Sequence, residues 1–184
     1  MTTDEFHKKV QQMLDREAIR DCLNRYARGL DRKDLEMIRS VFHRDATDHH
    51  GGPIAYHPAG EALIEDWSVR DAKRTFSHHL LLNCSIDLDG DVAHTETYFQ
   101  LVTGLSAEAA DDQPRLHLTG GRYVDRFERR AGDWRIATRV LIAEFSAAMD
   151  AIDYPHHRLW ARRTPADPSY SRPLLGPPSE SGES

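Results

Sequence analysis

Four long segments with strand-like alternation of side chains fill the second half of the chain. Their approximate bounds are residues 74–88, 92–105, 115–129 and 134–149. The turns between them fall at residues 89–90, 108–112 and 131–133. Because consecutive long strands with short links usually pair in opposite directions, this pattern predicts an antiparallel meander.

Helical patterns precede this sheet. They cover approximately residues 4–30, 35–43 and 60–73, and short β elements at residues 46–50 and 53–56 come before the third helix. Helices that come first and a sheet that follows indicate an α+β fold, with the helices packed against one face of a curved antiparallel sheet. A strongly bent sheet leaves a cone-shaped cavity between the two layers, where a ligand can bind.

The length of the chain suggests a single domain. With 184 residues, it suits one domain over residues 1–160, followed by a tail over residues 161–184. The tail is dense in Pro, Ser and Gly and has no hydrophobic periodicity. We therefore expect it to be disordered or extended over a neighbouring surface.

Charge and composition argue against several classes of partner. The formal net charge is −6 and no block of Lys or Arg is present, so nucleic acid is not an expected partner. No stretch approaches the ~18 apolar residues of a membrane span, and no signal-type N-terminus is found, so we expect no membrane contact and a cytoplasmic location. Cys22 and Cys84 lack metal-type or redox-type spacing and are expected to be reduced core residues. A small molecule or another protein chain remains as the partner.

Asp31 follows the first helical pattern. Apolar residues at helical spacing lead up to it, namely Ile19, Leu23, Tyr26 and Leu30. A helix can end at Gly29 and turn Asp31 back toward the buried side. The alternative is that Asp31 caps the N-terminus of the next helix, and the pattern itself leaves both interpretations open.

His79 lies on the first long strand. Alternation groups His78 with the apolar residues of that strand and His79 with a polar face that also carries Ser77 and Asn83. Either the polar face lines the cavity, or a β-bulge resets the alternation. A histidine oriented by a carboxylate is a competent general base near neutral pH. Asp31 and His79, on two different elements, thus predict an acid/base pair across a pocket.

Four motifs resemble a known family. They are Arg16-Glu-Ala-Ile-Arg-Asp leading into Tyr26-Ala-Arg-Gly-Leu-Asp31, His79 followed four residues later by Asn83, Leu88-Asp-Gly-Asp-Val-Ala, and Gly121-Arg-Tyr-Val-Asp-Arg-Phe-Glu-Arg-Arg-Ala-Gly-Asp-Trp134-Arg-Ile. In order and spacing, over roughly residues 8–149, they resemble the SnoaL-like branch of the NTF2-like superfamily. That branch includes scytalone dehydratase, a hexachlorocyclohexane dehydrochlorinase and the bile-acid 7α-dehydratase. The resemblance implies a cone-shaped, cystatin-like fold.

The resemblance also implies roles for four residues. In dehydratase-like members, a helix-end aspartate orients a strand histidine that removes a proton from substrate, and the matching positions are Asp31 and His79. Tyr26 resembles a pocket tyrosine that could donate to a carbonyl or a leaving hydroxyl, although a core aromatic fits the same pattern. Arg139 matches a strand arginine that dehydrochlorinase-like members place in the pocket, with an exposed strand position as the alternative.

Other polar residues are candidates for binding substrate. One of His49 and His50 should face the cavity if they lie on a short strand, and we take His49 as that residue. Adjacent strand residues point to opposite sides, so these histidines cannot easily share an ion and no metal is predicted. Asn83 and His117 are further candidates, with a surface position as the alternative for His117.

Together these residues predict a cofactor-independent lyase of the dehydratase type. Its substrate would be a hydrophobic, oxygenated small molecule such as a polyketide, steroid or terpenoid fragment. A double-bond isomerase or a polyketide cyclase could use the same pocket. A non-catalytic subunit, such as the small chain of a ring-hydroxylating dioxygenase, is the alternative outside enzymes, because one fold hosts many functions. In either case we expect a homodimer or homotrimer.

Overall fold

The computed structural model of the protein describes residues 1–50, 55–70, 74–105, 115–151 and 162–174. The helices are α1 (Thr3–Arg32), α2 (Leu35–Val41) and α3 (Ala59–Arg70). The strands are β1 (Phe42–His49), β2 (Ala55–Tyr56), β3 (Arg74–Asp89), β4 (Val92–Leu105), β5 (Arg115–Arg130) and β6 (Asp133–Asp150). The three predicted helices and the four predicted long strands are thus confirmed.

The strands of the described chain form one curved, open sheet in the order β2-β1-β6-β5-β4-β3. Strands β3 to β6 pair antiparallel in chain order, which confirms the predicted meander. Strand β1 pairs parallel with β6, so the sheet is mixed rather than entirely antiparallel. The rule for short links does not apply to this pair because β1 and β6 lie far apart in the sequence.

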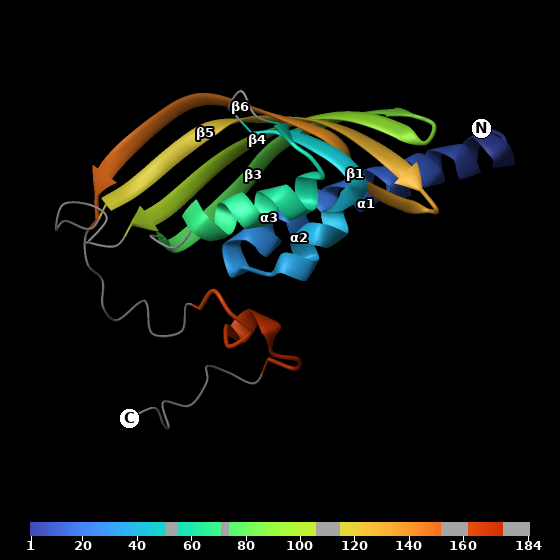
Figure 1. The fold of residues 1–184 in the computed structure, drawn as a ribbon. Helices are drawn as coiled ribbons and strands as arrows, with labels where there is room; N and C mark the ends of the chain where they lie inside the picture. The colour runs from blue at the N-terminus through green and yellow to red at the C-terminus, as the bar shows by residue number, and fades with distance from the viewer. Residues whose placement is uncertain (51–54, 71–73, 106–114, 152–161, 175–184) are drawn as a thin grey trace.

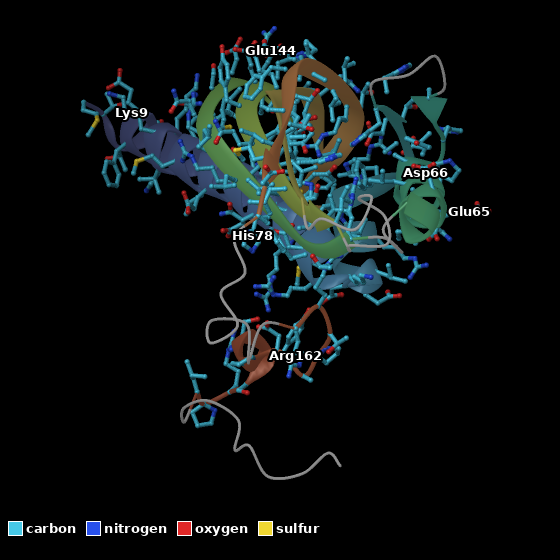
Figure 2. The ribbon with its side chains drawn as sticks, turned by 90° about the vertical axis from the view of Figure 1, so that its left-hand side faces the viewer. Lys9, Glu65, Asp66, His78, Glu144 and Arg162 are labelled. Carbon is cyan, nitrogen blue, oxygen red and sulfur yellow. The ribbon has the colours of Figure 1, made fainter. Side chains whose placement is uncertain are left out.

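All three helices lie on the concave side of the sheet, and β3 to β6 arch over them (Figure 1). Helix α1 packs against β3 and β6, and α3 packs against β1. The first turns of α1 project beyond the sheet, where Lys9 is labelled in Figure 2. In the described part of the chain, no helix combines the length and apolar character needed to cross a bilayer.

The apolar stripe predicted for α1 forms part of the core. Its members are all buried, namely Ile19, Leu23, Tyr26 and Leu30. Cys22 lies beside them as a buried free thiol, and Cys84 on β3 is a partly buried free thiol. Because this stripe fixes which side of α1 faces the sheet, it also fixes where the last turn of α1 presents its side chains.

Helix α1 does not end at Gly29, as the sequence suggested. It continues to Arg32, and Lys33 closes it in the left-handed conformation with φ of 56°. A Cβ atom at Gly29 would lie 2.9 Å from Cγ1 of Ile38. Gly29 therefore serves the close approach of α2 to α1, and the last turn of α1 remains helical at Asp31.

A β-bulge explains the alternation in β3. The pairing of β3 with β4 shifts between Leu81 and Cys84. From Ser77 to Leu81 the odd-numbered residues face the helices, and from Cys84 to Leu88 the even-numbered residues do. Both explanations of the alternation therefore hold. Near His79 the polar face of β3 faces the helices, and beyond the bulge the apolar residues of the strand face them instead. His78 points outward and is exposed.

The C-terminal segment that the structure describes, residues 162–174, lies against the end of α1. It includes a short 3₁₀ helix, Pro168–Tyr170, and Arg162 marks it in Figure 2. The guanidinium group of Arg163 donates two hydrogen bonds of 3.1 Å to α1, one to the carbonyl oxygen of Leu30 and one to that of Asp31. The carbonyl of Leu30 also accepts a long, 3.4 Å hydrogen bond from the backbone N–H of Lys33, so Arg163 adds donors at a helix end where carbonyl groups lack regular intrahelical partners. The remainder of the predicted tail, residues 175–184, lies outside the described residues.

Candidate active site

The end of α1 and the start of β3 bring Asp31 and His79 together. Nδ1 of His79 lies 2.7 Å from Oδ1 of Asp31, and the two side chains are 5% and 15% exposed. An ionised carboxylate can only accept a hydrogen bond, so Nδ1 of a neutral His79 carries the proton. Nε2 is then the unprotonated nitrogen and the one that can act as a base.

Further donors from β3 hold the carboxylate of Asp31 in place. The backbone N–H of His79 donates to Oδ2 at 3.0 Å, and the hydroxyl of Ser77 donates to Oδ1 at 3.0 Å. Ser77 and His79 share one face of the strand because they are two residues apart. The alternative role for Asp31, as the cap of α2, is wrong, because Asp34 accepts from a backbone N–H of α2 in that position.

His79 borders a small cavity on the helix side of the sheet. The apolar part of its described lining consists of Leu30, Leu63 and Leu101. The polar part consists of His79 itself and of Tyr26, His50, Asp66 and Arg74. The cavity volume bounded by the described residues is about 70 Å³. At roughly 30 Å³ for each water molecule, this is room for about two waters beside the imidazole.

Tyr26 is both a core residue and part of the cavity lining. Its ring meets that of His79 edge-on, with centroids 6.3 Å apart and an interplanar angle of 73°. Burial raises the pKa of Tyr26 to about 12, so its phenol stays protonated near neutral pH. Among the described residues its hydroxyl meets no partner at normal hydrogen-bond geometry. The hydroxyl oxygen is itself fully buried, so the phenol is a proton donor that adjoins the cavity from the core side.

Arg139 is fully buried, contrary to the alternative of an exposed strand position. Its guanidinium group makes two 2.7 Å hydrogen bonds to the carboxylate of Asp125. The guanidinium carbon also lies 4.1 Å from the ring centroids of both Tyr26 and Tyr123. Arg139 is not among the described residues that line the cavity. Arg139 instead packs against the ring of Tyr26 within the core, and Asp125 already neutralises its charge.

A second pairing of histidine with carboxylate lies at the end of β1. Asp48 is fully buried, and its Oδ2 lies 3.3 Å from Nδ1 of His50. Asp48 pairs in register with Arg139 of β6, so it adjoins the buried ion pair. This pair was not predicted from the sequence. Its signal was the two-residue spacing of Asp48 and His50, since alternate residues of an extended chain point to the same side.

The other predicted binding residues lie away from the cavity. His49, the last residue of β1, is exposed, and the cavity is lined instead by His50, which follows the strand, so the choice of His49 as the cavity residue is corrected. His117 is exposed because a register shift between Gly120 and Gly121 reverses which residues of β5 face the helices. Asn83 is exposed at the bulge of β3. Within the described ranges, no group of three or more His, Cys, Asp or Glu is arranged to hold a metal.

A curved sheet over three helices, with a cavity between the layers, defines an NTF2-like α+β fold. Within that class, the family model of the SnoaL-like domain matches residues 11–140. The chain therefore belongs to the SnoaL-like domain family, which confirms the resemblance drawn from its motifs. No curated protein matches the chain.

Solved structures share this fold. A protein from Kribbella flavida is 23% identical, with a TM-score of 0.69 over 74% of this chain and 95% of that chain. A type 2 hexachlorocyclohexane dehydrochlorinase (LinA) is 18% identical, with a TM-score of 0.69 over 79% and 96% of the two chains. A candidate scytalone dehydratase from Novosphingobium aromaticivorans is 16% identical, with a TM-score of 0.67 over 79% and 93%.

Proposed function

We propose that this protein is a cofactor-independent lyase of the dehydratase type in which His79 removes a proton from substrate. The observation that carries the proposal is the 2.7 Å contact between Nδ1 of His79 and Oδ1 of Asp31 at the edge of a cavity. A histidine held in this way typically contributes ~10²- to 10⁴-fold in rate as a general base. Structural neighbours named as a dehydrochlorinase and a candidate dehydratase support an elimination reaction.

The chemistry uses three side chains. Nε2 of His79 takes a proton from a carbon atom beside a substrate carbonyl, and Asp31 stabilises the imidazolium that forms, as the buried acid does in hydrolase triads. The phenol of Tyr26 donates to the carbonyl oxygen, where negative charge develops. A carbon–carbon double bond then forms as the hydroxyl on the next carbon leaves, with a proton, as water.

The cavity supports a hydrophobic and oxygenated substrate. Its leucine side chains suit a carbon skeleton, and its polar groups suit a carbonyl and a hydroxyl. A volume of about 70 Å³ admits the reacting end of a molecule. Pockets that hold a whole drug-sized ligand measure ~300–1,000 Å³. The rest of a polyketide, steroid or terpenoid fragment would extend beyond the described lining. A double-bond isomerase or a cyclase would use the same base.

The small volume favours one candidate outside the enzymes, a binding or structural subunit. In such a protein the contact between Asp31 and His79 would contribute only to packing between α1 and β3. The two candidates differ in a measurable way. An enzyme must convert a substrate at a rate that depends on His79, whereas a subunit must not.

A panel of β-hydroxy ketones with hydrophobic substituents tests the proposal, because dehydration yields a conjugated enone that absorbs in the ultraviolet. We expect turnover by the native protein and a loss of ~10²- to 10⁴-fold in kcat/KM for His79→Ala. Asp31→Asn should also lower turnover, because it removes the charge that stabilises the imidazolium. His78→Ala is the matched control, since this neighbouring histidine is exposed.

Two outcomes would contradict the proposal. Turnover that survives His79→Ala in a folded protein would remove His79 from the reaction. A complete lack of turnover across the panel would favour the subunit.

A further inference from the structure

A second histidine shares the cavity with His79. His50, which follows β1, and His79, on β3, both contribute to its lining. Each has a carboxylate at Nδ1, Asp48 at 3.3 Å for His50 and Asp31 at 2.7 Å for His79. Because these contacts occupy Nδ1, Nε2 of each ring is the nitrogen left for a molecule in the cavity. The cavity thus has two oriented imidazoles, supplied by different elements.

We propose that His50 is the general acid that protonates the leaving group, an inference that rests on the proposed function. Hydroxide is a poor leaving group, so elimination of water needs a proton donor at oxygen as well as a base at carbon. Nε2 of His79 takes the proton of the C–H bond, and the electrons of that bond form the double bond. The C–O bond breaks as its oxygen takes the Nε2 proton that His50 carries in its imidazolium form, which leaves His50 neutral with its remaining proton on Nδ1 beside Asp48. The products are an enone and water.

The resting protonation states are restored through solvent. After the elimination, His79 holds one additional proton and His50 has lost one, so the transfer of a proton between them through water completes the cycle. The side chain of His50 is 25% exposed, whereas that of His79 is 5% exposed. His50 is accordingly the ring that solvent reaches, and His79 is the shielded one. This asymmetry suits a donor that is reprotonated by water and a base that acts on carbon.

The other polar groups of the described lining are less suited to the acid role. Burial raises the pKa of Tyr26 to about 12, so this phenol holds its proton too tightly to release it near neutral pH. Asp66 accepts a 2.8 Å hydrogen bond from the hydroxyl of Tyr56. Arg74 carries a guanidinium group, which does not lose its proton in proteins. An imidazole is the group that both holds and releases a proton near neutral pH.

The groups that surround His50 keep its ring in position. Besides the hydrogen bond to Asp48, the imidazole of His50 contacts the ring of Tyr56. The two ring centroids are 6.3 Å apart, and the interplanar angle is 60°. Asp48 cannot turn away to solvent because it is fully buried beside Arg139. The carboxylate that orients His50 is therefore fixed from the core side, in the same way that β3 fixes the carboxylate of Asp31.

A comparison of leaving groups separates the acid from the base. The two substrates are a β-hydroxy ketone and the β-chloro ketone with the same skeleton, because chloride leaves without a proton. His50→Gln should lower kcat/KM by ~100-fold or more for the hydroxy ketone and by less than about threefold for the chloro ketone. His79→Ala should lower kcat/KM for both. The matched control is His49→Gln, which alters the adjacent, exposed histidine and should leave both rates unchanged.

The outcomes distinguish the two proposals. A similar loss on both substrates for His50→Gln, or no loss on the hydroxy ketone, would overturn the role of His50 and leave His79 as the base. If the native protein converts neither ketone, or if His79→Ala retains its activity, the proposed function fails and the role of His50 fails with it. Circular dichroism verifies the fold of each variant, and His50→Asn replaces His50→Gln if that variant does not fold.

Discussion

Asp125→Asn should destabilise the protein strongly although it preserves the size of the side chain. Asp125 and Arg139 are both fully buried and are joined by two 2.7 Å hydrogen bonds. The substitution removes the negative charge and leaves the guanidinium group of Arg139 without its direct counter-charge. The amide oxygen of the variant can still accept a hydrogen bond from one N–H group of Arg139. The amide NH₂ group then faces the second N–H group, and two donors cannot bond to each other.

The loss of one partner from a buried ion pair typically costs ~3–5 kcal/mol. The total free energy of unfolding of a domain is typically ~5–15 kcal/mol, so this is a large share. With ~2–4 °C for each kcal/mol in a protein of this size, Tm should fall by ~6–20 °C. The rings of Tyr26 and Tyr123 attract the buried cation by ~2 kcal/mol or more, but they do so in both proteins and therefore do not restore the loss.

Urea unfolding followed by circular dichroism measures this effect. The double variant Asp125→Leu with Arg139→Met removes both charges and should recover much of the lost stability, because an apolar pair can replace a buried ion pair at little cost. A loss of less than about 1 kcal/mol in Asp125→Asn, typical of an exposed pair, would refute the reasoning. It would indicate that Asp48, which is in register with Arg139, supplies the counter-charge instead.

Three further predictions concern the C-terminal end of α1. Gly29→Ala should lower the unfolding free energy by ~1–3 kcal/mol, since the new Cβ would lie 2.9 Å from Cγ1 of Ile38, and an unchanged Tm would contradict this close packing. Arg163→Ala should cost ~0.5–1.5 kcal/mol for each lost hydrogen bond and speed hydrogen exchange in the last turn of α1, whereas exchange at the native rate would argue against docking of the segment. Although burial opposes ionisation, hydrogen bonds from Ser169 and other donors lower the pKa of Asp167 to about 2, so the stability it contributes is present above pH ~3.8 and is lost as the pH falls toward 2. Pepsin cleavage of the C-terminal segment, normalised to a denatured substrate, should rise over that range, and cleavage independent of pH would contradict the shift.

Much of the fold could be predicted from the sequence because it follows from periodicity. The spacing of Ile19, Leu23 and Tyr26 determines the buried side of α1, and strand alternation with short turns determines the meander. The parallel pairing of β1 with β6 could not be predicted, because no local pattern specifies which distant strand a given strand joins. The role of Gly29 could not be predicted either, since a close approach between helices depends on tertiary packing.

The candidate site could likewise be predicted only as far as local patterns and motifs allow. The resemblance of motifs directed attention to Asp31 and His79, and the structure brings them into contact. Alternation alone did not decide between His78 and His79, because the bulge in β3 exchanges the two faces of the strand partway along it. A register shift in β5 likewise turns His117 outward. His50 could have been identified from its two-residue spacing to Asp48, but only if the burial of Asp48 had been known.

Exchange of a substrate proton with solvent tests the central claim most directly, because it measures removal of a proton from carbon without any leaving group. A ketone that carries α-protons but no β-substituent is incubated with the protein in D₂O, and proton NMR follows the loss of the α-proton signal. We predict exchange by the native protein and by His50→Gln at similar rates, and none above the buffer rate for His79→Ala. Native protein that catalyses no exchange, or His79→Ala that exchanges as fast as the native protein, would contradict the assignment of His79 as the base.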